Sequence, residues 1–127
     1  MAVGLSTTNL ANAMLNGIRG TSFTNAATYI QLHTGNPGAS GTSNVSAVTT
    51  RQQATFAAAS GGAIALSATP TAWNMTTSET IAYISVWTAS SAGSFLWSAQ
   101  LSVSKTVANG DTLTLNTCGL SLAPLAA

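Results

Sequence analysis

The stretch from residue 95 to residue 104 alternates apolar and polar side chains, and this pattern constrains the fold more than any other feature of the chain. One set of alternate positions is apolar: Phe95, Trp97, Ala99, Leu101 and Val103. The positions between them are mostly polar. Successive side chains of a β-strand point to opposite faces, so this period of two predicts a strand with one buried face and one polar face.

Two hairpins are predicted around this strand. Residues 81–87 are apolar on both faces, as in a central strand covered on two sides, and residues 88–93 link them to the alternating strand. The Asn109-Gly110 pair is typical of a tight turn and predicts a second hairpin between residues 105–107 and 111–115. The other strand candidates are residues 29–33, 51–56, 62–68 and 120–122.

Together these patterns predict a mainly β fold, an antiparallel β-sandwich of about seven or eight strands with one short N-terminal helix. The chain of 127 residues has a length that suits one hydrophobic core. We therefore expect a single β-sandwich domain over residues 1–127, in which residues 1–20 form an N-terminal arm and helix and residues 33–50 form a long loop.

The helix is expected because apolar side chains recur at helical spacing in the N-terminal arm. These side chains are Leu10, Ala13, Met14 and Ile18. Thr7 or Thr8 can cap the first turn, and Gly17 offers a stop. The arm has neither a positively charged leader nor an apolar run of signal-peptide length, so we expect synthesis and retention in a cytoplasm until assembly.

Charged side chains make up only 4% of the residues, whereas an ordinary soluble domain devotes about a quarter of its residues to them. The cations Arg19, Arg51 and Lys105 are far apart, so no basic stripe is available to neutralise a run of phosphates. No apolar run has the length of a membrane span. We expect neither nucleic acid nor membrane as a partner. An uncharged polar exterior suits contact with other protein, which indicates a subunit of a larger assembly.

The residues that catalysis or metal binding would need are few and scattered. His33, Glu79 and Asp111 are the candidates for acid–base chemistry, and no Gly-x-Ser-x-Gly motif accompanies them. Three distant positions make a poor metal site, and Cys118 is the only cysteine, so there is neither an internal disulfide framework nor a thiolate cluster. We expect a protein that is not an enzyme and binds no cofactor or metal.

The long loop of residues 33–50 is rich in residues that favour turns. They include Gly35, Asn36, Pro37, Gly38 and Asn44. A loop longer than about 12 residues in a compact domain is often a binding element, so these five residues are predicted to contact a partner protein. A disordered loop is the alternative. Residues 2–8 are the second predicted contact element.

Two residues beside that loop are predicted to act as structural ties. His33 stands at the end of a strand and is expected to bond to loop backbone. The planar guanidinium of Arg51 can bind several loop carbonyls, or pair with Glu79 or Asp111, and so fix the path of the loop. A solvated arginine at the start of a strand is the alternative.

The three tryptophans divide into core and surface candidates. Trp97 lies in the apolar register of its strand and Trp87 within an apolar run, so both are expected in the core. Trp73 lies between Pro70 and Asn74 in a less regular segment, and is predicted to be an exposed or interfacial aromatic.

Several segments together resemble a known family. The phrase from Tyr29 to Gly38 (YIQLHTGNPG), followed by Gly41 and Arg51-Gln52, is similar to the opening of small virion proteins of tailed bacteriophages, described as tail-fibre-like or capsid decoration proteins. Later segments follow in the order that the family shows: Phe56 to Gly62, Val86-Trp87, Gly93 to Ser98 and Lys105 to Asp111. Asn36 stands where the family usually has an acid, so the loop has lost charge. The resemblance implies a structural protein of a phage particle.

From the resemblance and the neutral exterior, we predict a structural component of a tailed-phage virion, made in the bacterial host cytoplasm. The favoured version is a capsid decoration protein that binds the major capsid protein or other virion proteins and reinforces the head shell without covalent bonds. A homo-oligomer, as a trimer, would attach multivalently at a local symmetry axis. This choice rests on the absence of coiled-coil heptads and fibre-shaft repeats.

Two other classes remain open at this stage. The main alternative is a tail-tip, baseplate or tail-fibre subunit that recognises a host surface, with sugar binding through Trp73 and polar loops. An ice-binding protein is suggested by Thr112 and Thr114 on one strand face, but the regular array that such a face requires is missing.

Overall fold

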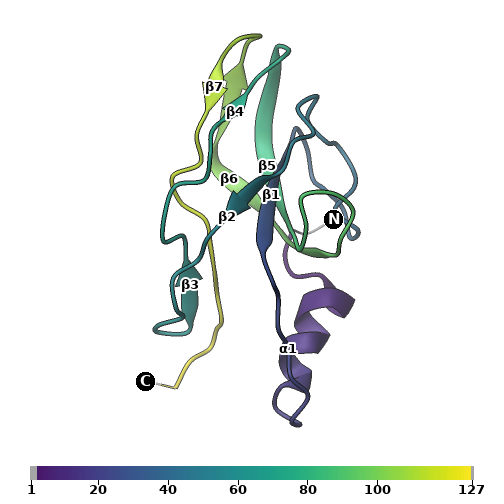
Figure 1. Cartoon of the computed structure of the whole chain (residues 1–127), viewed down its shortest axis with the longest axis vertical. Coiled ribbons are helices and arrows are strands. Elements are labelled where there is room, and N and C mark those ends of the chain that lie inside the picture. The colour runs from purple at the N-terminus through teal and green to yellow at the C-terminus, as the bar shows by residue number, and fades with distance from the viewer. Residues whose placement is uncertain (1–2, 127) are drawn as a thin grey trace.

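The computed structural model of the protein describes residues 3–126 and shows eight strands in antiparallel sheets with one short helical segment (Figure 1). The main sheet has the order β2-β1-β5-β6 and consists of β1 (Thr28–His33), β2 (Gln52–Ala54), β5 (Glu79–Trp87) and β6 (Phe95–Val107). Two small sheets pair β3 (Ala63–Ala65) with β8 (Gly119–Ser121), and β4 (Trp73–Asn74) with β7 (Thr112–Leu113). The predicted mainly β, antiparallel fold is confirmed.

The core lies between the main sheet and the two small sheets. Ile30 and Leu32 of β1 pair with Val86 and Ile84 of β5, and all four side chains are buried. Partly buried side chains from the small sheets and the segments beside them pack against this cluster: Ile64, Leu66, Leu113, Leu115, Cys118 and Leu120. Fully burying one side chain of this kind stabilises the fold by about 1.5–3 kcal/mol, so this contact holds the two layers together.

Strand β5 is central, as its apolar character on both faces predicts. It pairs with β1 on one side and with β6 on the other. Trp87 pairs with Phe95 across the end of the β5–β6 hairpin, and the two rings contact each other with centroids 5.6 Å apart. The predicted hairpin through residues 88–93 is therefore confirmed.

The alternation in β6 predicts burial only over residues 99–102, which are half-buried and exposed in turn, whereas residues 95–98 are buried on both faces. Phe95 and Trp97 are buried, but Val103 is 64% exposed. The reason is a bulge: Tyr83 of β5 pairs with Gln100, whereas Ile81 pairs with Lys105, so two steps along β5 correspond to five along β6. A bulge leaves its residues unpaired and bends the strand, which turns Val103 away from the core.

The predicted hairpin at Asn109-Gly110 is wrong in the pairing of the strand that follows the turn. The turn itself forms, because the Asp111 side chain accepts a hydrogen bond from the Ala108 backbone N–H at 2.8 Å and Gly110 has a positive φ of 94°. The strand that follows is β7, which pairs with β4 rather than returning along β6. The end of β6 is already paired, with Val107 opposite Glu79 of β5. The turn therefore carries the chain from the main sheet to the second layer.

The N-terminal helix forms one residue earlier than predicted. A π-helical turn, η1 (Thr7–Ala11), continues into α1 (Asn12–Asn16), which ends at Gly17. The cap is Ser6, whose hydroxyl oxygen accepts a hydrogen bond from the Asn9 N–H, and not Thr7 or Thr8. Leu10 is buried against the core, but Ile18 lies beyond the helix and is 86% exposed.

Candidate interaction surfaces

His33 is completely buried at the end of β1 and joins the long loop to the main sheet. Its Nδ1 lies 2.8 Å from the carbonyl oxygen of Ser43, and its Nε2 lies 2.7 Å from the hydroxyl of Ser85. A carbonyl can only accept, so Nδ1 donates and Nε2 of the neutral ring accepts from Ser85, which in turn accepts from the indole N–H of Trp87. Burial is the main cause that lowers the pKa of the His33 imidazole.

Glu79 makes a second connection to the long loop that the sequence analysis did not identify. Its carboxylate accepts hydrogen bonds from the Ser46 hydroxyl and from the Ala47 backbone N–H. The same Ser46 hydroxyl oxygen accepts from the Val48 N–H, and Val48 is buried in the core. One carboxylate on β5 thus fixes the C-terminal half of the loop.

The tip of the long loop is closed by its own polar groups. The Asn36 side-chain oxygen accepts from the Gly38 N–H, and the Asn44 amide donates to the Asn36 carbonyl. Gly41 has a φ of 74° and lies against the Phe95 ring so closely that an added Cβ would be 2.4 Å from a ring carbon. Only glycine fits both requirements. The loop is therefore an ordered part of the fold, and the alternative of a disordered loop is wrong.

These connections place the predicted contact residues of the loop as follows. Pro37 is buried, Gly35, Asn36 and Gly38 are half-buried, and Asn44 is exposed. Of these five residues, Asn44 therefore offers the largest accessible fraction to a partner. Pro37 is turned inward because the loop folds back on the end of β1.

Arg51 binds carbonyls, but those of a different loop from the one expected. Its guanidinium donates to the backbone carbonyls of Ala89 and Ala92 at 3.0 and 2.7 Å and to the side chain of Gln31 at 3.2 Å. It also stacks over the Trp87 ring, 3.9 Å from the centroid. Neither Glu79 nor Asp111 is among these partners. Arg51 thus fixes the β5–β6 loop, whereas the long loop of residues 33–50 is fixed by His33 and Glu79.

The prediction that Trp73 is exposed is wrong. The side chain is 1% exposed, and its indole N–H donates to the Thr50 carbonyl at 2.9 Å. Pairing of β4 with β7 places Trp73 opposite Leu113, inside the second layer. Because β4 is only two residues long, the sequence shows no strand pattern there that would have predicted this burial. A ring with 1% of its surface exposed cannot serve as an open platform on which a sugar stacks.

Exposed large apolar side chains lie in two segments toward one end of the molecule, and we call these two segments the apolar end. Leu15 lies in α1, Ile18 and Phe23 follow it, and Leu122 and Leu125 lie in the C-terminal segment. Figure 1 shows α1 and the segment after it at the lower end of the long axis, and the C-terminus toward the same end on the other side of the molecule. The sequence patterns do not reveal this surface, because Ile18 falls in the same helical stripe as Leu10 and Met14 and is expected to pack with them.

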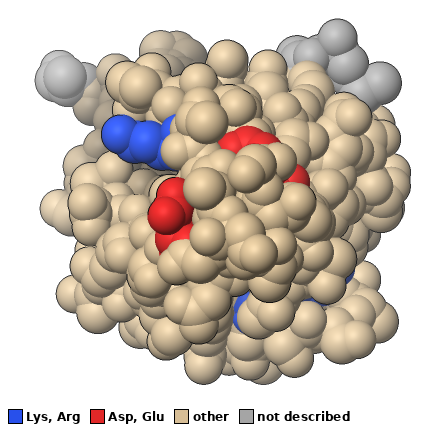
Figure 2. All heavy atoms as spheres, turned by 90° about the horizontal axis from the view of Figure 1, so that it is seen from above, with Lys and Arg blue, Asp and Glu red and all other residues tan. Residues whose placement is uncertain are grey.

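The opposite end of the molecule carries few charges. Figure 2 looks down on it and shows small, separate groups of charged atoms in an otherwise uncharged surface. Two of the charged side chains already stabilise loops: the Glu79 carboxylate binds the long loop, and the Arg51 guanidinium binds the β5–β6 loop. The ammonium group of Lys105 makes no hydrogen bond or ion pair with any residue between 3 and 126, although its backbone lies opposite Ile81 in the sheet.

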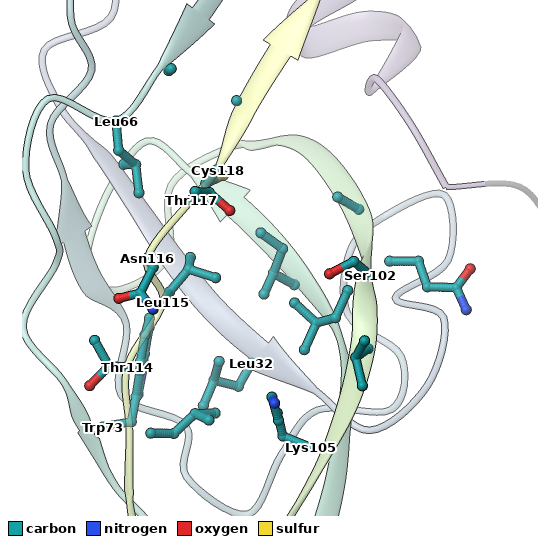
Figure 3. Close-up of a pocket in the computed structure, with 18 residues that line it drawn as sticks. Leu32, Leu66, Trp73, Ser102, Lys105, Thr114, Leu115, Asn116, Thr117 and Cys118 are labelled. Carbon is teal, nitrogen blue, oxygen red and sulfur yellow. The ribbon is translucent and has the colours of Figure 1, made fainter.

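An apolar groove of about 590 Å³ opens between β6 and residues 113–119 (Figure 3). Leu32 and Trp73 lie at its base, and Lys105 stands beside them on the β6 wall. Cys118 lines the other wall, where burial raises the pKa of its thiol to about 11 and keeps it protonated at neutral pH. Lys105 is the only charged residue among the described residues that line the groove, so most of the groove suits apolar side chains.

The described residues form neither a cluster of metal ligands nor a membrane-spanning helix. Within residues 3–126, no three His, Cys, Asp or Glu side chains come together as metal ligands. None of the helices there is both long and apolar enough to cross a bilayer. His33, Glu79 and Asp111 each bind separate parts of the backbone and are not brought together.

The fold and these surfaces define a small, mainly β protein with exposed apolar side chains and one apolar groove. Residues 4–123 match the model of the Gp80 family, described as podophage GP4 fiber I protein gp80, and the chain belongs to this family. The protein is accordingly a structural component of a phage virion, as the resemblance in the sequence implies. A search of curated proteins gives no match.

Proposed function

We propose that this protein is a non-enzymatic fibre subunit that packs against other virion proteins through its apolar end. The observation that carries the proposal is the exposure of Leu15, Ile18 and Phe23 in and after α1, together with that of Leu122 and Leu125 in the C-terminal segment. Monomeric soluble proteins rarely leave such side chains together in contact with water, and grouped ones are typical of protein contact sites. The description of its family favours the fibre over the capsid decoration role.

The low charge of the chain supports the same proposal. Arg19 is the only charged residue between positions 15 and 26, so covering this segment desolvates a single ion. Desolvating unpaired ions is the main cost of burying a polar surface, and this end largely avoids it. If several copies join as a homo-oligomer, such as a trimer, each copy contributes a weak contact to the particle, and together these contacts hold the oligomer stably.

The proposal includes no catalysis. His33, the only histidine, is buried, and both of its ring nitrogens are engaged with Ser43 and Ser85. A general base must reach a substrate proton, which this position does not allow.

The experiment that tests the proposal introduces Ile18→Asp together with Phe23→Asp into the phage gene. We expect about a tenfold or greater loss of this chain from purified particles, measured by quantitative mass spectrometry, because each buried carboxylate would lose its hydration. Thr77→Asp places a charge on an exposed residue outside the apolar end and serves as the control. Urea unfolding of each purified variant checks the fold. Unchanged incorporation of the double variant would remove the assignment.

A capsid decoration protein is the second candidate, and a specific observation favours it. Within residues 3–126 the helical elements η1 and α1 contain five residues each, and the rest is a β domain without a shaft. The position of the chain in a particle reconstruction separates the two roles, because head sites follow the symmetry and copy number of the shell. Density on the shell axes would replace the fibre assignment, and density on a projecting appendage would support it.

A further inference from the structure

The groove between β6 and residues 113–119 lies outside the apolar end and has no occupant in the fold described above. Figure 3 shows residues 114–118 along one wall, Ser102 and Lys105 on β6 along the other, and Leu32 between them. The β6 wall is the edge of the main sheet. The N-terminal arm covers this edge only at its start, where Ser6 donates to the Leu96 carbonyl and Ser98 donates to that of Gly4.

The total surface of the chain indicates that a protein contact is missing. The accessible surface is 7197 Å², whereas a compact monomer of the same mass exposes about 6,200 Å². The excess is roughly 1,000 Å², which is close to the area of about 800 Å² that one partner buries in a standard interface.

The charges around the groove decide what kind of partner fits. Covering the groove would take the ammonium group of Lys105 out of water, which is costly unless a carboxylate pairs with it. A second copy of this chain has two carboxylate side chains: Glu79, whose two oxygens both accept hydrogen bonds from the long loop, and the exposed Asp111, whose Oδ2 accepts one. With so few carboxylates in the chain, a protein of different sequence is the better source, and a second copy is an outcome that the test separates.

We propose that this groove binds an extended apolar segment of a different virion protein, with an Asp or Glu of that segment beside Lys105. The inference rests on the proposed function and adds the chemistry of the partner. The bulge over residues 101–104 interrupts the edge of β6, so contact through side chains, rather than a continuous backbone ladder, holds the segment. Val103, which the bulge leaves exposed at the groove, contacts the partner directly.

Photo-crosslinking in the assembled particle tests this proposal. Val103 is replaced by p-benzoyl-L-phenylalanine, the purified particles are irradiated, and the adduct is identified by mass spectrometry. We expect an adduct with a different virion protein, on a peptide that contains Asp or Glu. An adduct with a second copy of this chain, or none although the chain is present in the particle, would overturn the groove proposal alone. Absence of the wild-type chain from particles would overturn the proposed function as well.

Charge reversal provides a second test that does not need the bulky probe. Lys105→Glu is expected to lower the number of copies in the particle about tenfold, because two carboxylates would then face each other. Lys105→Arg keeps the charge and is expected to retain incorporation. Thr77→Glu adds a carboxylate outside the groove and controls for the effect of an added carboxylate at an exposed position. Equal incorporation of Lys105→Glu and wild type would overturn the pairing of Lys105.

Discussion

Two turn-rich segments of this protein with at most one charged residue each behave in opposite ways. Residues 34–50 are fixed to the main sheet by His33 and by Glu79, and they bury Pro37 and Val48. Residues 17–26 have a similar composition, yet every one of them is exposed, and the hydrogen bonds of their first turn are local. Ile18 and Phe23 of this second segment remain available to a partner.

This contrast teaches that composition does not distinguish an anchored loop from a contact segment. The deciding feature is whether a few polar side chains from the sheet reach the loop backbone. Each such hydrogen bond adds about 0.5–1.5 kcal/mol, and several together offset the entropy of ordering the loop. The segment without these bonds keeps its apolar side chains outside, where another protein can cover them.

The strongest test of the anchored loop is Gly41→Ala. The new Cβ would lie 2.4 Å from the Phe95 ring at a φ of 74°, so we expect the free energy of unfolding to fall by about 2–4 kcal/mol. Urea unfolding measures the change. Gly110→Ala has a φ of 94° but no atom within 4 Å of its Cβ, and it should show the backbone cost of about 1–2 kcal/mol by itself. Equal losses in both variants would contradict the close packing of Gly41 on Phe95.

Glu79→Gln is expected to have the next largest effect. The amide has one acceptor oxygen where the carboxylate uses two, for the Ser46 hydroxyl and the Ala47 N–H. We expect a loss of about 1–2 kcal/mol, with faster hydrogen exchange confined to residues 45–48. Exchange in residues 17–26 serves as the internal reference and should not change. A uniform increase over both segments would mean that Glu79 stabilises the whole fold rather than the loop.

The pH dependence of stability tests the His33 connection. Burial holds the pKa of His33 below the unfolded value of 6.5, so the folded state binds fewer protons than the unfolded state in this range. The contribution of neutral His33 is complete above pH 6.5 and is lost as the pH falls through the lower pKa of the folded protein. Urea midpoints measured from about pH 8 to pH 5 should decline on the acid side. In the same pH series, His33→Gln should lose the part of the decline in urea midpoint that is due to His33. An unchanged slope in this variant would contradict the assignment to His33.

The smallest effect is expected in the unanchored segment. Ile18→Ser removes an 86% exposed side chain that holds no other part of the fold. The free energy of unfolding should change by less than about 0.5 kcal/mol. Thermal and urea unfolding of the purified chain measure it, with Leu10→Ser as a buried counterpart that should be clearly destabilised. A large loss with Ile18→Ser would remove the contrast between the two segments.

Local patterns predict much of the β structure. The strand at residues 29–33 and the hairpin of residues 81–87 with the strand after it form as predicted, because alternation and turn residues act within a few positions. Pairing between distant strands is not encoded in this way. The turn at Asn109-Gly110 is visible in the sequence, but the choice of β4 as the partner of β7 depends on what β5 and β6 have already paired with.

The candidate surfaces divide in the same way. Sequence alone determines that the chain is nearly free of ions, that it is mainly β, and that it resembles phage virion proteins, because these properties are carried by residue types and short motifs. Only the tertiary structure decides that Trp73 is inside, that Glu79 fixes the long loop, and that an apolar groove opens beside Lys105. Burial and hydrogen-bond partners depend on residues far apart along the chain, and their distances exist only once the sheets have formed.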